Sequence, residues 1–196
     1  MKKSVYSRPN KPMFIERKKR NLATLAKPEI RQPLTVDRAS ECHITPAPVA
    51  ARMASYLGPL KSGKILEPSA GTGALLQALL DVGTEPQAIT AIERHNKLAS
   101  ALSFEGVTVR NCCFLEYAAD TGERFEKIIM NPPFSKVRQH MKAALALLDK
   151  KEGAALVALV PITFQHEDAQ TLEELDENTF ATAKVRTKII LIEAMN

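Results

Sequence analysis

Cysteine is scarce in this sequence, and the three that occur are poorly arranged for cross-linking. Cys112 and Cys113 are adjacent and Cys42 stands alone, which gives no disulfide framework. No cysteine and histidine have the spacing of a zinc site, so we expect no bound metal. The four histidines are expected to be surface or loop residues: His43, His95, His140 and His166. The cysteine pattern favours a reducing compartment and predicts a cytoplasmic protein.

Long apolar runs are absent as well. The longest, Ala154 to Val160, is far shorter than the ~20 residues that span a bilayer. The start, Met1 to Val5, has no apolar core of a secretory signal. We therefore expect no membrane association. With 45% apolar and 25% charged residues, the 196-residue chain is long enough for one domain with a substantial core.

Acidic residues are few at the amino end. Residues 1–40 contain eleven lysines and arginines against three acidic residues, a net charge of +8. The other 156 residues contain sixteen lysines and arginines against nineteen acidic residues, a net charge of −3. We interpret residues 1–40 as an extended basic arm that contacts phosphates through Arg17, Lys18, Lys19 and Arg20. A solvated tail that only keeps the chain in solution is the alternative.

The most informative stretch is Asn131-Pro132-Pro133-Phe134, which follows the apolar run 125–130. That run predicts a short buried strand, because it is rich in β-branched and aromatic residues and Pro132 ends ladder pairing. The motif therefore lies at the carboxyl end of a strand, the edge at which open α/β sheets bind ligands.

This motif suits the activation of an amine. An exocyclic amine is a poor nucleophile because its lone pair is delocalised, and hydrogen-bond acceptors can activate it. The side-chain oxygen of Asn131 and the carbonyl of Pro132 are such acceptors, and the two prolines fix their direction. Phe134 can stack on a flat substrate, a contact of roughly 1–3 kcal/mol per base. The alternative is a plain Pro-Pro turn with Phe134 as a loop anchor.

A second motif, Glu67-Pro68-Ser69-Ala70-Gly71-Thr72-Gly73, follows an apolar strand and precedes an amphipathic helix. Gly71 and Gly73 allow backbone to approach a ligand closely, and the helix offers unpaired N–H groups. The pattern lacks the third glycine of the dinucleotide fingerprint and the Gly-Lys-Ser/Thr of a phosphate loop. Neither NAD nor ATP is therefore favoured.

The order of these two motifs resembles the S-adenosylmethionine-dependent amino-methyltransferases, above all the N6-adenine DNA methyltransferases of the gamma class. The resemblance spans residues 42–194 and implies a Rossmann-like α/β fold with a mostly parallel seven-stranded sheet and an antiparallel C-terminal strand. It makes residues 41–196 the methyltransferase catalytic domain, of bacterial or phage type. Because only about 25 residues, 162–186, separate Pro161 from the last predicted strand, we expect no separate target-recognition domain of the kind that sequence-reading relatives usually carry.

The cofactor-contacting residues that we expect include Glu93, which ends a second strand about twenty residues after Gly73 and can accept hydrogen bonds from ribose hydroxyls. The resemblance adds Thr45 and Pro46, in a turn that would close over the methionine end of the cofactor. Thr45 can equally be a helix cap followed by proline. The remaining expected contacts are Glu67, Pro68, Ser69, Ala70, Gly71, Gly73, Cys113, Phe114 and Asn131.

Cys113 departs from the family pattern. Relatives commonly have an aspartate there, which accepts from the adenine amine of the cofactor, whereas a thiol is a weak acceptor. Phe114 can pack along the adenine face or belong to the core.

The pattern after the catalytic motif predicts a helix over 135–150, a buried strand over 153–160, a short helix over 167–175 and a final strand over 187–194. We therefore predict an enzyme that methylates the N6 amine of adenine in DNA, with Asn131, Pro132, Pro133 and Phe134 as catalytic residues. An RNA base amine and a protein glutamine remain alternative substrates. An inactive nucleic-acid-binding module is the alternative of another class.

Overall fold

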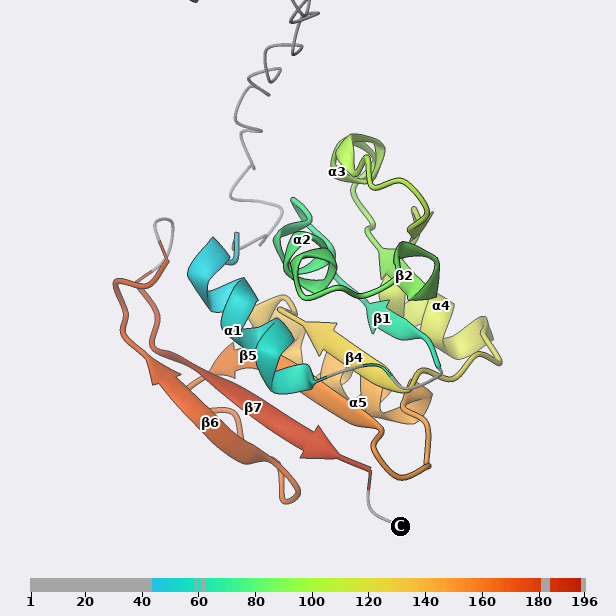
Figure 1. Ribbon diagram of the computed structural model, residues 1–196. Coiled ribbons are helices and arrows are strands. Elements are labelled where there is room, and N and C mark those ends of the chain that lie inside the picture. The colour runs from blue at the N-terminus through green and yellow to red at the C-terminus, as the bar shows by residue number, and fades with distance from the viewer. Residues whose placement is uncertain (1–43, 59, 61–62, 181–183, 195–196) are drawn as a thin grey trace, which may run out of the picture. The chain divides into compact units, whose positions relative to one another are not determined.

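A seven-stranded sheet with helices on both faces forms the part of the chain that the computed structural model describes (Figure 1). The described residues are 44–58, 60, 63–180 and 184–194. The predicted basic arm, with Arg17, Lys18, Lys19 and Arg20, lies outside them, as do Cys42 and His43.

The strand order in the sheet is β3-β2-β1-β4-β5-β7-β6. Five strands are parallel neighbours: β1 (Ile65–Glu67), β2 (Ile89–Ile92), β3 (Thr108–Arg110), β4 (Lys127–Met130) and β5 (Ala155–Pro161). The last strand, β7 (Thr187–Glu193), runs antiparallel between β5 and β6 (Gln170–Leu175). This is the predicted Rossmann-like α/β architecture with an antiparallel C-terminal strand.

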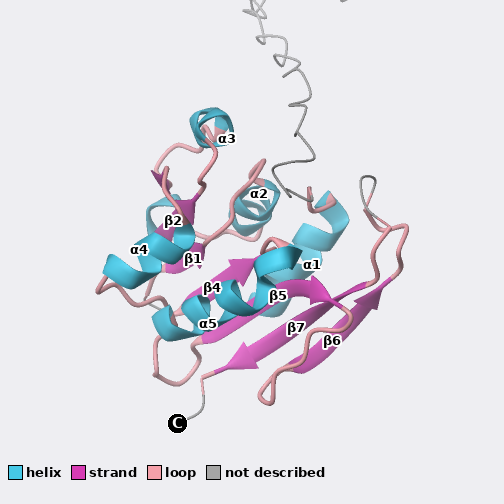
Figure 2. Ribbon diagram, turned by 180° about the vertical axis from the view of Figure 1, so that it is seen from behind, coloured by secondary structure: helices cyan, strands magenta, loops and turns pink. Residues whose placement is uncertain are grey.

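Neighbouring residues along each central strand point to opposite faces of the sheet and so belong to different hydrophobic cores. Ile65 and Ile129 belong to a core covered by helices α1 and α2, whereas Leu66 and Ile128 belong to a core covered by α4 and α5. Both cores are continuous and apolar, which explains why β1, β2 and β4 are buried along their whole length. Figures 1 and 2 show the two helical layers from opposite sides. The helices are α1 (Ala47–Leu57), α2 (Ala74–Asp81), α3 (Asn96–Ala101), α4 (Phe114–Asp120) and α5 (Val137–Leu147).

Most predicted elements are confirmed with small shifts of their ends. The helix predicted over 135–150 consists of a 3₁₀ turn, η3 (Phe134–Lys136), followed by α5. A second 3₁₀ turn, η2 (Pro86–Ala88), leads into β2. Within the described residues, no helix is long and apolar enough to cross a membrane.

The helix predicted over 167–175 is wrong, because this segment contains strand β6. Leu172 and Leu175 are three residues apart, which is a helical spacing and would place them on opposite faces of a regular strand. The pairing with β7 shifts between Thr171 and Glu173, so that Leu172 is an extra, bulged residue. The bulge returns both leucines to the same core, beside α1 and α2.

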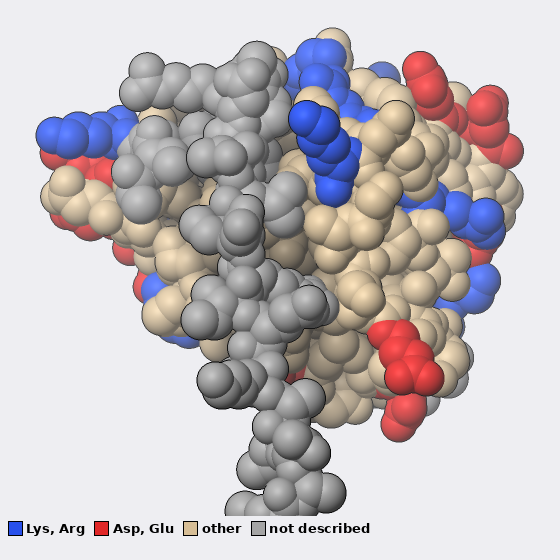
Figure 3. All heavy atoms as spheres, turned by 90° about the horizontal axis from the view of Figure 1, so that it is seen from above, with Lys and Arg blue, Asp and Glu red and all other residues tan. Residues whose placement is uncertain are grey.

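Charged side chains of both signs are spread over the described surface. The described residues contain fifteen lysines and arginines against eighteen acidic residues. Figure 3 shows lysine and arginine side chains as well as acidic side chains on the face seen there. The positive net charge of the whole chain therefore comes from residues outside the described part.

Candidate functional site

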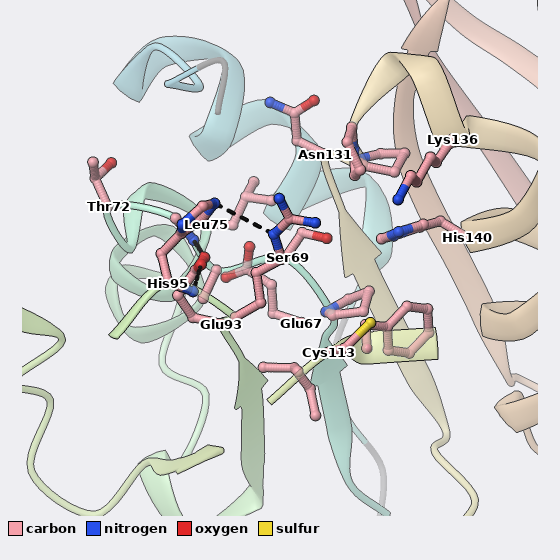
Figure 4. Close-up of a pocket in the computed structure, with 18 of the residues that line it drawn as sticks. Glu67, Ser69, Thr72, Leu75, Glu93, His95, Cys113, Asn131, Lys136 and His140 are labelled. Carbon is pink, nitrogen blue, oxygen red and sulfur yellow. Dashed lines mark hydrogen bonds between the residues drawn. The ribbon is translucent and has the colours of Figure 1, made fainter. Parts of the chain in front are cut away.

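A cavity of about 340 Å³ lies at the carboxyl ends of strands β1, β2 and β4 and extends to the first residues of α4 (Figure 4). Twelve of the predicted site residues line it: Thr45, Glu67, Pro68, Ser69, Ala70, Gly71, Glu93, Cys113, Phe114, Asn131, Pro132 and Pro133. The two sequence motifs, separated by a large part of the chain, thus share one cavity.

Three predicted residues are not among those that line the cavity: Pro46, Gly73 and Phe134. Pro46 precedes α1 and Gly73 precedes α2, so both shape the neighbouring backbone. Phe134 is half-buried and begins η3 directly after the prolines.

The structure adds wall residues that the sequence did not single out, among them Arg94, His95, Lys136 and His140. Arg94 and His95 directly follow Glu93, and Lys136 follows the catalytic motif by two positions. Proximity to a motif was therefore a usable signal for these three residues. His140 gives no such signal, because α5 brings it to the cavity from farther along the chain.

Asn131 is held by Thr45, which lies near the amino end of the described residues. Its Nδ2 donates a hydrogen bond to Thr45 Oγ1 over 3.0 Å. Thr45 is buried and does not cap α1, whose amino-terminal boundary residue is Pro46. The alternative role of Thr45 as a helix cap is therefore wrong. Nδ2 of Asn131 faces the threonine, and Oδ1 is the acceptor atom of the amide.

Glu93 connects the loops after three strands. Its Oε2 accepts from the backbone N–H of Gly71 over 2.8 Å, and its Oε1 accepts from the N–H of His95 over 2.7 Å. Asn111, which follows β3, donates from Nδ2 to the Glu93 carbonyl over 2.8 Å. A carboxylate with two backbone donors is fixed in direction, so one side chain sets the distance between the glycine turn and the loop after β2.

The glycine turn depends on left-handed backbone conformations. Gly71 has φ 55° and Gly73 has φ 84°, a region that side chains disfavour. A Cβ at Gly73 would lie 2.7 Å from Phe104 and 2.9 Å from Leu102. Gly73 is therefore required by its packing against the loop before β3. Gly71, in contrast, lines the cavity.

Glu67 is a buried acid next to a second acid. Its side chain is almost wholly buried, with the residue 1% exposed, and Oε2 has no hydrogen-bond partner among the described residues. Burial, and secondarily the charge of Glu93, raise the pKa of Glu67 to about 8. At neutral pH the side chain is therefore mainly protonated.

His140 is buried in the wall between α4 and α5, contrary to the expectation of a surface or loop residue. Its ring packs against the ring of Phe114, with centroids 5.4 Å apart and planes at 50°. Burial and the nearby cations Lys136 and Arg94 lower its pKa to about 4. The imidazole is neutral at physiological pH.

Cys113 lies at the boundary before α4 and makes no side-chain cap. Its neighbour Cys112 has a raised pKa, chiefly because of partial burial, so that its thiol stays protonated. In the part of the chain that is described, no group of three His, Cys, Asp or Glu residues could hold a metal ion.

Comparisons with known proteins support the architecture. The sequence matches no protein-family model and no curated protein. The fold matches the methyltransferase subunit of a type I restriction-modification system from Streptococcus thermophilus with a TM-score of 0.66 and 15% identity, over 79% of this chain and 45% of that chain. It also matches the 23S rRNA methyltransferase ErmE, with a TM-score of 0.61 and 18% identity, over 82% of this chain and 69% of that chain.

A third match is a putative methyltransferase, yhhF, from Escherichia coli, with a TM-score of 0.56 and 17% identity, over 84% of this chain and 89% of that chain. The chain spans less than half the length of the type I subunit. At these identities the likeness concerns the fold. The described domain has the Rossmann-like fold of these methyltransferases.

Proposed function

We propose that the cavity binds S-adenosylmethionine and that the protein transfers its methyl group to the exocyclic N6 amine of adenine in DNA. One observation carries the proposal: Asn131 and its prolines share a cavity wall with the glycine turn and Glu93. An amine-activating motif beside a ligand-binding turn is the arrangement that group transfer to an amine requires.

The cavity residues suit this cofactor. The cavity volume lies in the range of about 300–1,000 Å³ that is typical of small-molecule sites. The amino groups of the cofactor donate hydrogen bonds, and the buried, unpartnered Oε2 of Glu67 is an acceptor for such a donor. Glu93 holds the turn at Gly71 in place and offers its remaining lone pairs to hydroxyl groups.

Asn131 and Pro132 act on the substrate amine. When bound, S-adenosylmethionine supplies a methyl group on a positively charged sulfur. Asn131 Oδ1 and the Pro132 carbonyl accept the two amine hydrogens, which directs the nitrogen lone pair toward that methyl. The new N–C bond forms as the S–C bond breaks, and one amine proton leaves to water. Orientation of the amine supplies most of the rate in this scheme.

Phe134 holds the base at the margin of the cavity. It lies directly after the prolines but not among the wall residues, so its ring suits a base that enters from outside. In duplex DNA the base must first leave the stack, at a cost of a few kcal/mol. Stacking on Phe134 offsets part of that cost.

An RNA base amine is the second candidate substrate. A fold neighbour is named as a 23S rRNA methyltransferase and another as a restriction-modification methyltransferase subunit. The predicted basic arm favours nucleic acid of either kind over a protein glutamine. DNA is preferred because the motif pair resembles that of N6-adenine DNA methyltransferases.

The deciding experiment offers labelled S-adenosylmethionine to the full chain with DNA, RNA and total protein in separate reactions. Nucleoside analysis should find label in N6-methyladenine from DNA. Label in RNA nucleosides would show that an RNA base amine is the substrate. Label in protein would point to a glutamine side chain instead. Cofactor binding without transfer to any of the three would indicate an inactive binding module.

A further inference from the structure

We propose that His140 accepts a hydrogen bond from the exocyclic amine of the cofactor's adenine and thereby selects adenine-bearing ligands. This inference rests on the proposed binding of S-adenosylmethionine in the cavity. It assigns a role to a residue that the sequence motifs do not include, on a helix that follows the catalytic motif.

The first observation is the position of the ring. His140 is on α5, is 8% exposed, and lines the cavity together with Phe114 and Lys136. Figure 4 shows the nitrogen-bearing edge of its imidazole turned toward the cavity. Its Nδ1 has no hydrogen-bond partner among the described residues. A buried polar atom without a partner costs stability, and a ligand that approaches this edge can relieve that cost.

The second observation is the chemistry around the ring. Cys112, Cys113, Phe114 and Leu115 line the same cavity, and the Phe114 ring packs against the His140 ring. Thiols are weak acceptors, so His140 is the stronger acceptor of this group. Burial and the nearby cations Lys136 and Arg94 lower the pKa of His140, so its imidazole stays neutral. A neutral imidazole has one acceptor nitrogen, whereas an imidazolium has none.

The third observation separates this wall from the reacting amine. Asn131 is bonded to Thr45, in front of α1, whereas His140 packs on Phe114 of α4. The cavity therefore has one acceptor group in the proposed catalytic motif and another beside the Phe114 ring. A purine needs apolar contact for its face and a polar partner for its edge, and Phe114 and His140 supply one of each.

The experiment compares two ligands by calorimetry with the full chain and without nucleic acid, so that a target base cannot contribute. The ligands are S-adenosylhomocysteine and its analogue with hydrogen in place of the 6-amino group. Wild type should bind the 6-amino ligand about tenfold more tightly. His140→Phe keeps the packing on Phe114 and should reduce the ratio to about one. His140→Gln, which retains an acceptor oxygen, should keep most of the preference.

His166→Phe is the control, because His166 is a half-buried histidine that is not among the residues lining this cavity. It should leave the ratio of the two affinities unchanged. A His140→Phe protein that keeps the full preference would overturn the inference and leave the proposed function standing. If His140→Phe does not fold, His140→Leu, which also lacks an acceptor, takes its place: loss of the preference supports the inference and retention overturns it. Failure of wild type to bind either ligand would overturn both the proposed function and the role of His140.

Discussion

Thr45 and Asn131 are joined by a 3.0 Å hydrogen bond although 86 residues separate them in the chain. The bond connects the segment before α1 to the turn after β4, and both residues line the cavity. Thr45 therefore orients the amide that the proposed reaction uses.

Thr45→Val removes this hydrogen bond while keeping the shape of the side chain. We expect the turnover number to fall by about ten- to a hundredfold, since a misdirected Asn131 positions the amine poorly. Thr45→Ser retains the hydroxyl and should stay close to wild type. Single-turnover methyl transfer measures the effect, and equal rates for all three proteins would show that the bond is not needed to orient Asn131.

Asn131→Ala removes the acceptor itself. Turnover should fall by roughly 10²–10³, while S-adenosylmethionine affinity should change little, because the amide acts on the substrate amine. Asn178→Ala, in the exposed turn before β7, is the control. If Asn131→Ala retains near wild-type turnover, the Asn131 amide is not needed for methyl transfer.

Glu93→Ala should weaken cofactor binding and destabilise the domain together. It leaves the N–H groups of Gly71 and His95 without their carboxylate acceptor, which we expect to lower the free energy of unfolding by about 2 kcal/mol or more. Glu105→Ala, an exposed acid, is the matched control. Calorimetry and denaturant unfolding measure the two effects. Unchanged cofactor affinity would show that Glu93 does not contribute to cofactor binding.

Glu67 should make stability depend on pH. Its pKa is about 8 in the folded protein and near 4.5 when unfolded, so the folded state holds more protons between these values. The free energy of unfolding should therefore decrease as pH rises from about 4.5 to about 8. Glu67→Gln cannot ionise and should lose this decrease. Unfolding curves of the two proteins from pH 6 to 9 test it, and parallel pH profiles would contradict the assignment.

Deletion of residues 1–40 should weaken nucleic-acid binding almost equally for all sequences. For every phosphate that the basic run 17–20 neutralises in the intact protein, the deletion should reduce the slope of log affinity against log salt by about 0.9 for duplex DNA. Cofactor binding should not change. An unchanged salt slope would make the arm a solvating tail, and unfolding of the truncated protein would show that the arm belongs to the fold.

Where a motif ended a strand, the sequence predicted which residues meet at one edge of the sheet. Asn131, Glu67 and Glu93 each follow a short apolar run, and parallel strands bring their carboxyl ends to the same edge of the sheet. Their convergence therefore followed from the strand assignments alone. Local residue types were enough for this part of the structure.

Sequence patterns did not predict contacts that depend on packing between distant elements. The burial of His140 depends on how α5 lies against Phe114 of α4, and no local pattern encodes that contact. The bond between Thr45 and Asn131 depends likewise on where α1 begins. In β6 a bulge at Leu172 gives a strand the leucine spacing of a helix, so the local period indicated the wrong element.

The bulge in β6 also affects how the sheet meets other chains. β6 is an edge strand, and its irregular register and the ion pairs of Glu173 with Arg52 and Glu174 with Arg186 disfavour addition of a further strand. At the other edge, β3 spans only Thr108–Arg110 and offers few open backbone groups. Both edges of the sheet are therefore poor templates for aggregation through β-pairing, even though its central strands are almost wholly apolar.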